Sequence, residues 1–329
     1  MNIVIIGGGG FLGQKLARAL VARGTLNGRP ISRIVLADVA HPAGIEGAQI
    51  PIDGLRCDIT DPQSLAQAIT PDTDVIYHLA AVVSAHAEEA FEDGMRINLF
   101  GTYNILERCR TLGTVPRLVF TSSIAVYGGA VPDPITETSL LNPQSSYGAQ
   151  KAASEVLLND YARKGFVDGR GVRLPTISIR PGKPNRAASS FMSSILREPL
   201  NGQTANCPVD ADFLHYYLSP RKCVANLIRM GEIPAEKFGR NRILQMPGRT
   251  LSIRQMIDAM TAVAGPGPAR LITWEPDEAI RSIVGGWRHD IRAERGLALG
   301  LEADAGFEDN VRYYIEDDRS AGQRDGQAR

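Results

Sequence analysis

The chain reads V-F-T-S-S-I-A-V-Y-G over residues 119–128 and, after a polar loop, S-Y-G-A-Q-K over residues 146–151. A short apolar run after a proline predicts a buried strand at the start of this stretch. The strand is expected to end in Thr-Ser-Ser at Ser123. Ser145 and Ser146 are both suitable N-caps, so a helix is expected to begin there.

Tyr147 and Lys151 are four residues apart, which places both side chains on one face of the predicted helix. A lysine ammonium beside a phenol favours the phenolate, so the pKa of Tyr147 is expected to fall towards neutrality. Such a tyrosine serves as a general acid or base. Ser123 ends its strand where ligands meet open α/β sheets, and its hydroxyl is expected to hold a substrate oxygen against Tyr147. A Y-x-x-x-K pair is a weak signal by itself, so the surrounding motifs decide.

The bulk composition is that of an ordinary globular protein. The chain has 329 residues, 43% of them apolar and 22% charged, which suits a large core and two domains. Basic and acidic residues number 36 each, so net charge gives no reason to expect binding to nucleic acid or to an anionic membrane. The sequence has no apolar run of membrane-spanning length and no charged leader, so neither a membrane span nor a signal peptide is expected.

Four cysteines stand singly at positions 57, 109, 207 and 223. The chain has no C-x-x-C pair, so neither a disulfide framework nor a metal site is predicted. Free buried thiols are typical of a reducing compartment, and a cytoplasmic location is therefore expected.

A glycine-rich turn lies between the first predicted strand and helix. Asn2–Ile6 is β-branched and apolar, which predicts a strand buried on both faces, and Gln14–Arg23 has an apolar helical stripe. The intervening G-G-G-G-F-L-G lets the backbone approach a pyrophosphate at the start of a helix. The residues expected to contact a dinucleotide here are Gly7, Gly10, Phe11, Leu12 and Gly13.

Asp38 ends the second predicted strand, Ile34–Ala37. A carboxylate at this place accepts both ribose hydroxyls of NAD and would repel the 2′-phosphate of NADP. No arginine follows within residues 39–41 to reverse that preference. The sequence therefore predicts NAD as the cofactor.

Two further strands are expected to end beside the cofactor. Gly54–Asp58 reaches Asp58, which together with Ile59 is expected to meet the adenine. Asp74–His78 leads into Leu-Ala-Ala, where the small side chains let the cofactor pass close by. The residues expected to make this second contact are Leu79, Ala80 and Ala81.

One long helix is predicted over Glu88–Arg110, and Leu174–Ile179 is predicted as the next strand of the sheet. Asn98 is a poor residue inside a helix. It marks either a kink or a hydrogen bond behind the active site, or else it is a tolerated polar residue. The regular alternation of strands and helices predicts a Rossmann-type, doubly wound parallel sheet with a smaller α/β cap.

These motifs together resemble the extended branch of the short-chain dehydrogenase/reductase family, the NAD-dependent epimerase/dehydratase-like proteins. The resemblance covers about the first 185 residues. It rests on the glycine turn, Asp38, C-D-I-T-D around Asp58, H-L-A-A at residues 78–81, N-x-x-G-T from Asn98, S-S-x-x-V-Y-G from Ser122, Tyr147 with Lys151, and R-P-G at residues 180–182.

The resemblance implies a role for each member of the set. Tyr147 is the acid/base, Lys151 lowers its pKa and holds the nicotinamide ribose, and Ser123 positions the reacting oxygen. Asn98 is expected to anchor a water relay, and Pro181 to contact the cofactor. The family also implies a homodimer that pairs through two long helices, here Glu88–Arg110 and Ser146–Lys164.

The later part of the chain resembles one subgroup, whose NAD-dependent members oxidise a four-carbon sugar acid at C2. This resemblance is carried by R-P-G-K-P-N-R-A-A-S-S-F at residues 180–191 and D-F-L-H-Y-Y-L-S-P-R at residues 212–221. We expect an NAD-binding domain over residues 1–182 and a substrate cap over residues 183–316, part of which can return to the sheet. Residues 317–329 are polar and are expected to fray.

The expected reaction is oxidation of a small 2-hydroxy sugar acid, D-erythronate, with Tyr147 as base. Its carboxylate calls for a cation or a group of hydrogen-bond donors, and Arg186 and Lys183 are the candidate cations; the alternative is that Arg186 is a surface charge or part of an interdomain ion pair. The residues expected to bind this substrate are Ser84, His86, Ser123, Tyr147, Asn185, Arg186 and Ser189.

Two other functions share much of this pattern. A nucleotide-sugar epimerase or dehydratase would use the same residues up to Arg180, although R-P-G departs from the R-P-x-N-V-Y-G-P pattern of many such enzymes. A non-catalytic NAD-sensing protein would keep the glycine turn. The presence of Ser123, Tyr147 and Lys151 argues against this last function.

Overall fold

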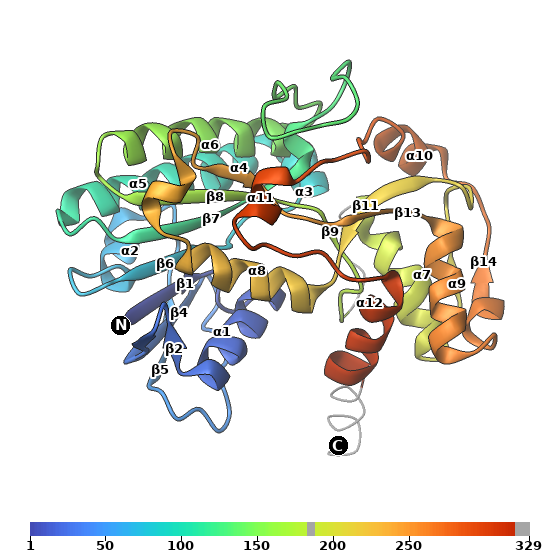
Figure 1. Cartoon of the computed structure of the whole chain (residues 1–329), viewed down its shortest axis with the longest axis horizontal. Coiled ribbons are helices and arrows are strands. Elements are labelled where there is room, and N and C mark those ends of the chain that lie inside the picture. Colours follow the sequence, from blue (N-terminus) through green and yellow to red (C-terminus); the bar gives the residue numbers. More distant parts are fainter. Residues whose placement is uncertain (183–187, 320–329) are drawn as a thin grey trace.

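The computed structural model describes residues 1–182 and 188–319. Within these residues, seven parallel strands form the central sheet in the order β12-β8-β7-β6-β1-β4-β5 (Figure 1). The predicted doubly wound parallel sheet is therefore confirmed. The strands are β1 Asn2–Ile6, β4 Arg33–Asp38, β5 Ile52–Arg56, β6 Val75–His78, β7 Arg117–Ser123, β8 Asp168–Leu174 and β12 Ile243–Gln245.

Helices cover both faces of this sheet because its strands are apolar on both sides. Along β1, Ile3 and Ile5 belong to one core, whereas Val4 and Ile6 belong to the other. The first core lies under α1 and α8, which pack side by side, and the second lies under α2, α5 and α6. These helices are α1 Phe11–Arg23, α2 Pro62–Ala68, α5 Gly101–Leu112, α6 Ser146–Arg163 and α8 Pro220–Glu232.

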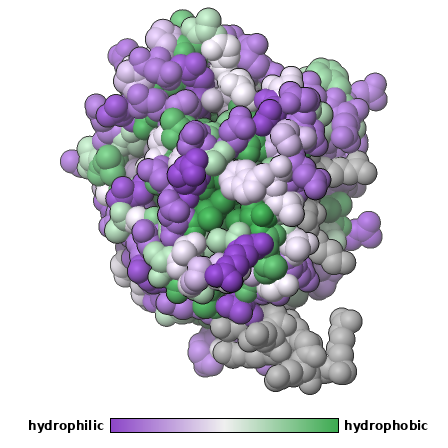
Figure 2. Space-filling model, turned by 90° about the vertical axis from the view of Figure 1, so that its right-hand side faces the viewer, coloured by the Kyte–Doolittle hydropathy of each residue, from purple (hydrophilic) through white to green (hydrophobic). Residues whose placement is uncertain are grey.

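A smaller α/β lobe stands beside the carboxyl ends of the strands (Figure 1). It has its own apolar core and a three-stranded sheet in the order β13-β11-β9. Figure 2 shows its outer face, where apolar residues gather in a patch bordered by hydrophilic ones. Its elements include β9 Thr176–Ile177, α7 Phe191–Leu200, β10 Ala205–Asn206, β11 Leu214–Leu218, β13 Arg249–Ser252, α9 Ile253–Ala264, β14 Ile272–Thr273, α10 Glu278–Val284 and α12 Phe307–Tyr314.

The remaining elements are short. They are β2 Thr25–Leu26, β3 Arg29–Pro30, α3 Ser84–Glu89, α4 Phe91–Gly94, the π-helix η1 Met95–Phe100, η2 Ile124–Val126, η3 Ala188–Ser190, η4 Ala235–Phe238, η5 Pro268–Leu271, α11 Glu294–Ala298 and the π-helix η6 Ile315–Arg319.

The prediction of a sheet strand at Leu174–Ile179 is wrong. The sheet strand is β8, Asp168–Leu174, and the following β9 pairs with β11 of the cap instead. The error arose because β8 contains two arginines, and charged residues in a sequence usually indicate an exposed segment. Both are buried, Arg170 at 0% exposure and Arg173 at 4%.

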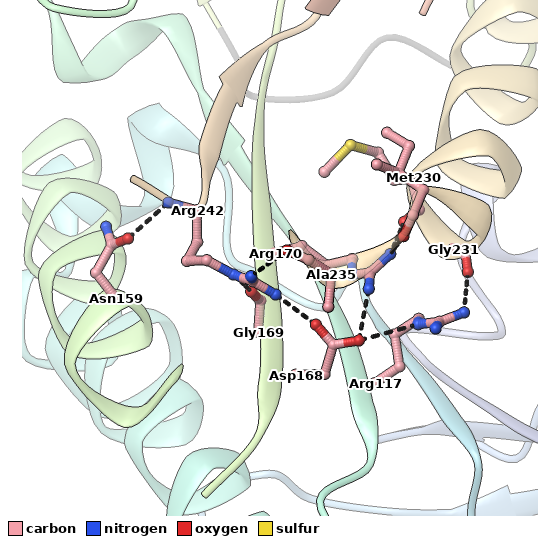
Figure 3. A network of polar contacts seen from close by, with 10 residues as sticks. Arg117, Asn159, Asp168, Gly169, Arg170, Met230, Gly231, Ala235 and Arg242 are labelled. Atoms are coloured by element: carbon pink, nitrogen blue, oxygen red, sulfur yellow. Dashed lines mark hydrogen bonds and ion pairs between the residues drawn. The ribbon is translucent and has the colours of Figure 1, made fainter. Parts of the chain in front are cut away.

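Arg170 is buried at the start of β8, where a carboxylate and backbone carbonyls accept from its guanidinium group (Figure 3). The carboxylate of Asp168 pairs with three guanidinium groups, those of Arg117, Arg170 and Arg242. Arg170 also donates to the carbonyls of Met230, at 2.8 Å, and Ile233, and Arg117 donates to that of Gly231. These carbonyls end α8, where the helix dipole favours a cation.

The long helix predicted over Glu88–Arg110 is divided. The chain forms α3, breaks at Ala90, and continues through α4 and the π-helix η1 into α5. Asn98 lies in η1. The helix predicted to begin near Ser145 is confirmed, because the Ser145 side chain accepts from the Gly148 N–H at 3.2 Å as the N-cap of α6.

The later chain returns to the large sheet. α8 packs on its first core, and β12 pairs with β8 as the outermost strand. Asp317 and Asp318, at the expected frayed tail, lie in η6 and form ion pairs with Arg221 and Lys15. Residues 320–329 lie outside the described part of the chain. All four cysteines are buried free thiols. None of the helices described is long and apolar enough to cross a membrane.

Candidate active site

The glycine turn after β1 packs too closely for side chains. Gly7 has a φ of +87°, and a Cβ atom there would lie 2.7 Å from the backbone nitrogen of Ala80. A Cβ atom on Gly13 would overlap the carbonyl oxygen of Gly7. The turn leads into α1, whose N-cap Gly10 provides no side-chain cap, so the first-turn N–H groups are free to face an anion.

Asp38, at the end of β4, lies against this turn. Its Oδ2 accepts from the Gly9 N–H at 3.0 Å and its Oδ1 from the Val39 N–H at 2.7 Å. Both carboxylate oxygens keep lone pairs for further donors. The cradle and the fixed carboxylate together fit a dinucleotide whose pyrophosphate meets α1 and whose ribose meets Asp38.

The other predicted cofactor residues lie at neighbouring strand ends. Asp58 accepts from the N–H of Thr60 at 2.9 Å and from its hydroxyl at 2.8 Å, and these bonds lower the pKa of Asp58. Ile59 is buried. The N–H groups of Leu79 and Ala80 both donate to the Ile6 carbonyl, at 2.8 and 3.1 Å. Ala81 and Pro181 are half-buried. Their contacts with adenine and nicotinamide stay predictions.

Ser123 and Tyr147 are brought together at the end of β7, where the serine hydroxyl acts on the phenol and favours its ionised form. Ser123 also accepts from the Ala125 N–H at 3.1 Å, which fixes its rotamer. A Cβ atom on Gly148 would overlap the Ala125 carbonyl, so the glycine after Tyr147 lets α6 approach this close. The tyrosine is thus held against the serine by backbone packing.

The prediction that the pKa of Tyr147 falls towards neutrality is wrong. Burial raises the pKa of the phenol to about 12, and the Ser123 hydrogen bond only partly offsets it. Lys151 does not reverse the shift, because its ammonium lies 5.7 Å from the centroid of the Tyr147 ring and donates to the Thr121 carbonyl at 2.9 Å. Burial also lowers the pKa of Lys151 to about 7, so part of its charge is lost near neutral pH.

Asn98 is buried behind this site. Its Oδ1 accepts from the Val82 N–H at 2.9 Å, and its Nδ2 donates to the Val82 carbonyl at 3.2 Å and to Gln150 Oε1 at 2.8 Å. It therefore connects the segment after β6 with the helix that carries Tyr147 and Lys151. Of the three interpretations of its sequence position, a hydrogen bond behind the active site is the one observed. Its water relay stays a prediction.

The predicted substrate residues are less closely grouped. Ser84 begins α3, and His86 on the same helix lies 3.3 Å from Asp93 through its Nε2. Ser189 lies in η3, before α7. Lys183, Asn185 and Arg186 lie outside the described residues.

Arg180 is a cation that sequence reasoning did not select. Leu174 pairs with Ser123 in the sheet, and the chain from Leu174 crosses through β9 into the cap before it reaches Arg180. Burial and the nearby Arg197 lower the pKa of its guanidinium. Within the described residues, no carboxylate pairs with it.

Sequence reasoning also missed the polar residues that hold the helix of Tyr147 and Lys151 in place. Glu88 accepts from the Ser146 N–H at 2.8 Å and so holds the start of α6. Gln150 binds Asn98, and Glu155 binds Arg173. Gln150 and Glu155 are buried charged or polar residues on a helix, and the spacing of Glu155, four after Lys151, was the available signal.

A Rossmann-type sheet with serine, tyrosine and lysine at its carboxyl edge is typical of enzymes that transfer hydride with NAD. The sequence profile described as NAD dependent epimerase/dehydratase family matches residues 3–213. The chain belongs to this family, as the resemblance predicted, and its cofactor is NAD.

Individual relatives extend the match over nearly the whole chain. A D-erythronate dehydrogenase from Cupriavidus necator is 50% identical over 321 residues, covering 96% of this chain and 98% of that protein. A D-erythronate dehydrogenase from Haemophilus influenzae is 43% identical, covering 97% and 100%. The crystal structure of a nucleoside-diphosphate-sugar epimerase from Agrobacterium tumefaciens superposes with a TM-score of 0.92 at 44% identity, covering 97% of this chain and 95% of that one.

Proposed function

We propose that this protein oxidises D-erythronate at C2 with NAD, giving 2-oxo-tetronate. One observation carries the proposal. Ser123, Tyr147 and Lys151 occupy one site in a chain that matches D-erythronate dehydrogenases over almost its full length.

In this reaction Tyr147 takes the proton of the C2 hydroxyl, and Ser123 holds the same oxygen as it becomes a carbonyl. NAD, when bound, supplies the hydride acceptor. Lys151 contributes through its charge, because a protonated ammonium one helical turn away favours the phenolate. Ser123 also favours the ionised form of the phenol, because its hydroxyl lies beside Tyr147.

The substrate carboxylate requires a cation. Arg186 is the candidate from the sequence. Arg180 is a second candidate, because its guanidinium is partly buried and lies near another cation, Arg197. An incoming carboxylate would offset both the burial of Arg180 and its repulsion by Arg197. Arg180→Gln is expected to raise KM for the acid at least tenfold with little effect on NAD binding, whereas Arg180→Lys retains part of the affinity. Equal KM values for both variants and the wild type would remove Arg180 from the site.

The alternative is a nucleotide-sugar epimerase, because the Agrobacterium tumefaciens protein, 44% identical to this chain, is a nucleoside-diphosphate-sugar epimerase. An epimerase would use the same serine, tyrosine and lysine but would release no net NADH. A non-catalytic NAD sensor is not favoured, because Ser123, Tyr147 and Lys151 are all present and lie at one site.

The deciding experiment supplies purified protein and NAD with a panel of four-carbon sugar acids, and with UDP-glucose, while NADH is followed by absorbance. The expected result is NADH formation with D-erythronate and none with UDP-glucose. Tyr147→Phe is expected to lower kcat by about 10²–10⁴-fold. Tyr161→Phe, the same change near the other end of α6, where the hydroxyl bonds Glu107, is the matched control and should leave kcat unchanged. Epimer formation without NADH would instead establish the alternative.

We also propose a cytoplasmic homodimer. Phe100, Tyr103 and Val156 are 53%, 41% and 65% exposed on η1, α5 and α6, which form the outer layer of one face. Apolar side chains gathered on neighbouring helices are typical of an interface. Light scattering should give a dimer for the wild type and a monomer for Val156→Lys. Leu297→Lys, at a residue of similar exposure on α11, is the control and should stay dimeric.

A further inference from the structure

A buried polar network lies one helical turn beyond Lys151. Glu155, 2% exposed, accepts from Arg173 through both oxygens: Oε1 lies 2.9 Å from Nε and Oε2 lies 2.7 Å from Nη2. Its Oε1 also accepts from the Ser122 hydroxyl at 2.5 Å. Arg173 completes the network by donating to the hydroxyl of Tyr127. Glu155 thus binds two strands, β7 and β8, from the helix that covers them.

The strand residue that Glu155 binds lies between two residues of the active site. Ser122 stands between Thr121, whose carbonyl accepts from Lys151, and Ser123, which binds Tyr147. The bond from Ser122 to Glu155 therefore holds the strand end that both catalytic contacts use. Glu155 makes these contacts from behind the strand and has no role in holding the reacting atoms.

The charge of Glu155 also acts on Lys151. The Lys151 Nζ lies over the rings of Phe120 and Tyr147, 4.8 and 5.7 Å from their centroids, and burial disfavours its charge. His78, on β6, faces it as a neutral group because burial lowers the pKa of that imidazole to about 3. Glu155 is the carboxylate that favours the ammonium. Arg173, on β8, pairs with Glu155 and so partly neutralises that carboxylate.

We propose that Glu155 is a positioning residue that favours the charged form of the Lys151 side chain and holds the end of β7 in place, and that Arg173 limits the first effect by pairing with the Glu155 carboxylate. The proposal deepens the proposed function, because it concerns the ammonium that favours the Tyr147 phenolate. If the ion pair between Arg173 and Glu155 were purely structural, the loss of either residue would change the pKa of Lys151 in the same direction. In the proposal their effects have opposite signs.

Three variants separate these contributions. Glu155→Gln removes the negative charge and keeps an oxygen for Ser122, so the pKa of Lys151 should fall by about one unit. Arg173→Gln removes the positive charge and keeps an N–H donor for Glu155, so the same pKa should rise by about one unit. Ser122→Ala changes no charge, so it should lower kcat without moving that pKa.

The pKa can be measured without substrate or cofactor. The chain has six lysines, so the side-chain NMR signals of ¹³C-lysine-labelled protein are few, and Lys151→Met assigns the one of interest. The alkaline limb of kcat/KM against pH, measured with D-erythronate and NAD, should move in the same direction as the NMR pKa. It should move to lower pH in Glu155→Gln and to higher pH in Arg173→Gln.

The outcomes distinguish this inference from the proposed function. Shifts of the same sign in the two charge variants, or no shift in either, would overturn the inference. If Glu155→Gln does not fold, the other two variants still decide the inference. It requires the pKa of Lys151 to rise in Arg173→Gln and to stay unchanged in Ser122→Ala. A wild type that forms no NADH from any sugar acid would overturn the proposed function and leave the NMR result standing.

Discussion

Strand β8 carries a buried arginine network at each of its ends, and the two differ in charge balance. At its start, one carboxylate, Asp168, meets three arginines, and backbone carbonyls at the end of α8 take up the excess donors. At its other end, Arg173 meets one carboxylate, Glu155, with a tyrosine and a serine hydroxyl. The first network joins α8 to the sheet. The second lies directly behind the lysine of the active site.

The difference shows how one residue type serves two purposes on one strand. Burial lowers the pKa of Arg170 only to about 10, so the network at Asp168 keeps its charges across the physiological range. The pKa of Lys151, beside the other network, is about 7, so its charge depends on its neighbours. A fixed set of charges suits a scaffold, and an adjustable one suits a catalytic group.

The largest expected effect on stability is at the start of β8. Asp168→Asn leaves Arg170 without its carboxylate, and removing one partner of a buried pair costs about 3–5 kcal/mol of unfolding free energy. The kcat of the folded protein should stay within about twofold, because the network does not reach the active site. Denaturant unfolding and NADH formation measure the two quantities.

Asp160→Asn is the matched control for this change. Asp160 is an exposed carboxylate on α6 that pairs with Arg163, and its loss should cost no more than about 0.5 kcal/mol. An equal loss of stability in both variants would contradict the assignment of the Asp168 network to the scaffold.

A smaller effect is expected from pH at the active-site end. Because the folded pKa of Lys151 is about 7 and its ordinary value is 10.5, the unfolded chain binds more protons between these values. Stability from this group therefore rises with pH across that window, by up to about 1.4 kcal/mol per pH unit. Lys151→Met should flatten the rise, which unfolding of both proteins at pH 7 and pH 9 would show. Parallel curves would mean that Lys151 is not desolvated in the folded protein.

The smallest expected effect separates a hydrogen bond from a charge within the Arg173 network. Tyr127→Phe removes the hydroxyl that accepts from Arg173 and donates to the Thr136 carbonyl, at a cost of about 1–2 kcal/mol of unfolding free energy. No charge changes, so the pKa of Lys151 should stay where it is. Tyr313→Phe, whose ring faces Arg221, is the control and should alter neither quantity. A shift of the Lys151 pKa in Tyr127→Phe would mean that hydrogen bonding, rather than charge, controls it.

The sequence predicted the parts of the fold that depend on local patterns. Apolar runs followed by glycine or an acid marked β1 and β4, and Ser145 marked the start of α6. β8 was missed because the partners of its arginines come from distant segments: Glu155 for Arg173, and α8 for Arg170. A buried charge looks like a surface charge until those partners are known.

The candidate site shows the same division. Ser123, Tyr147 and Lys151 were predicted together from their motifs, and the structure brings them together. The direction of the Tyr147 pKa was wrong because spacing on a helix says nothing of desolvation. Glu155 was not selected because its contact with Ser122 joins residues 33 positions apart in the chain.

The placement of β12 has a consequence for how the chain is made. The outermost strand of the large sheet comes from Ile243–Gln245, so a nascent chain of about 180 residues leaving the ribosome has β8 as an open edge. Part of the cap is synthesised before that edge is covered. A truncated product that stops after about residue 180 would therefore expose a strand ready to pair with another chain.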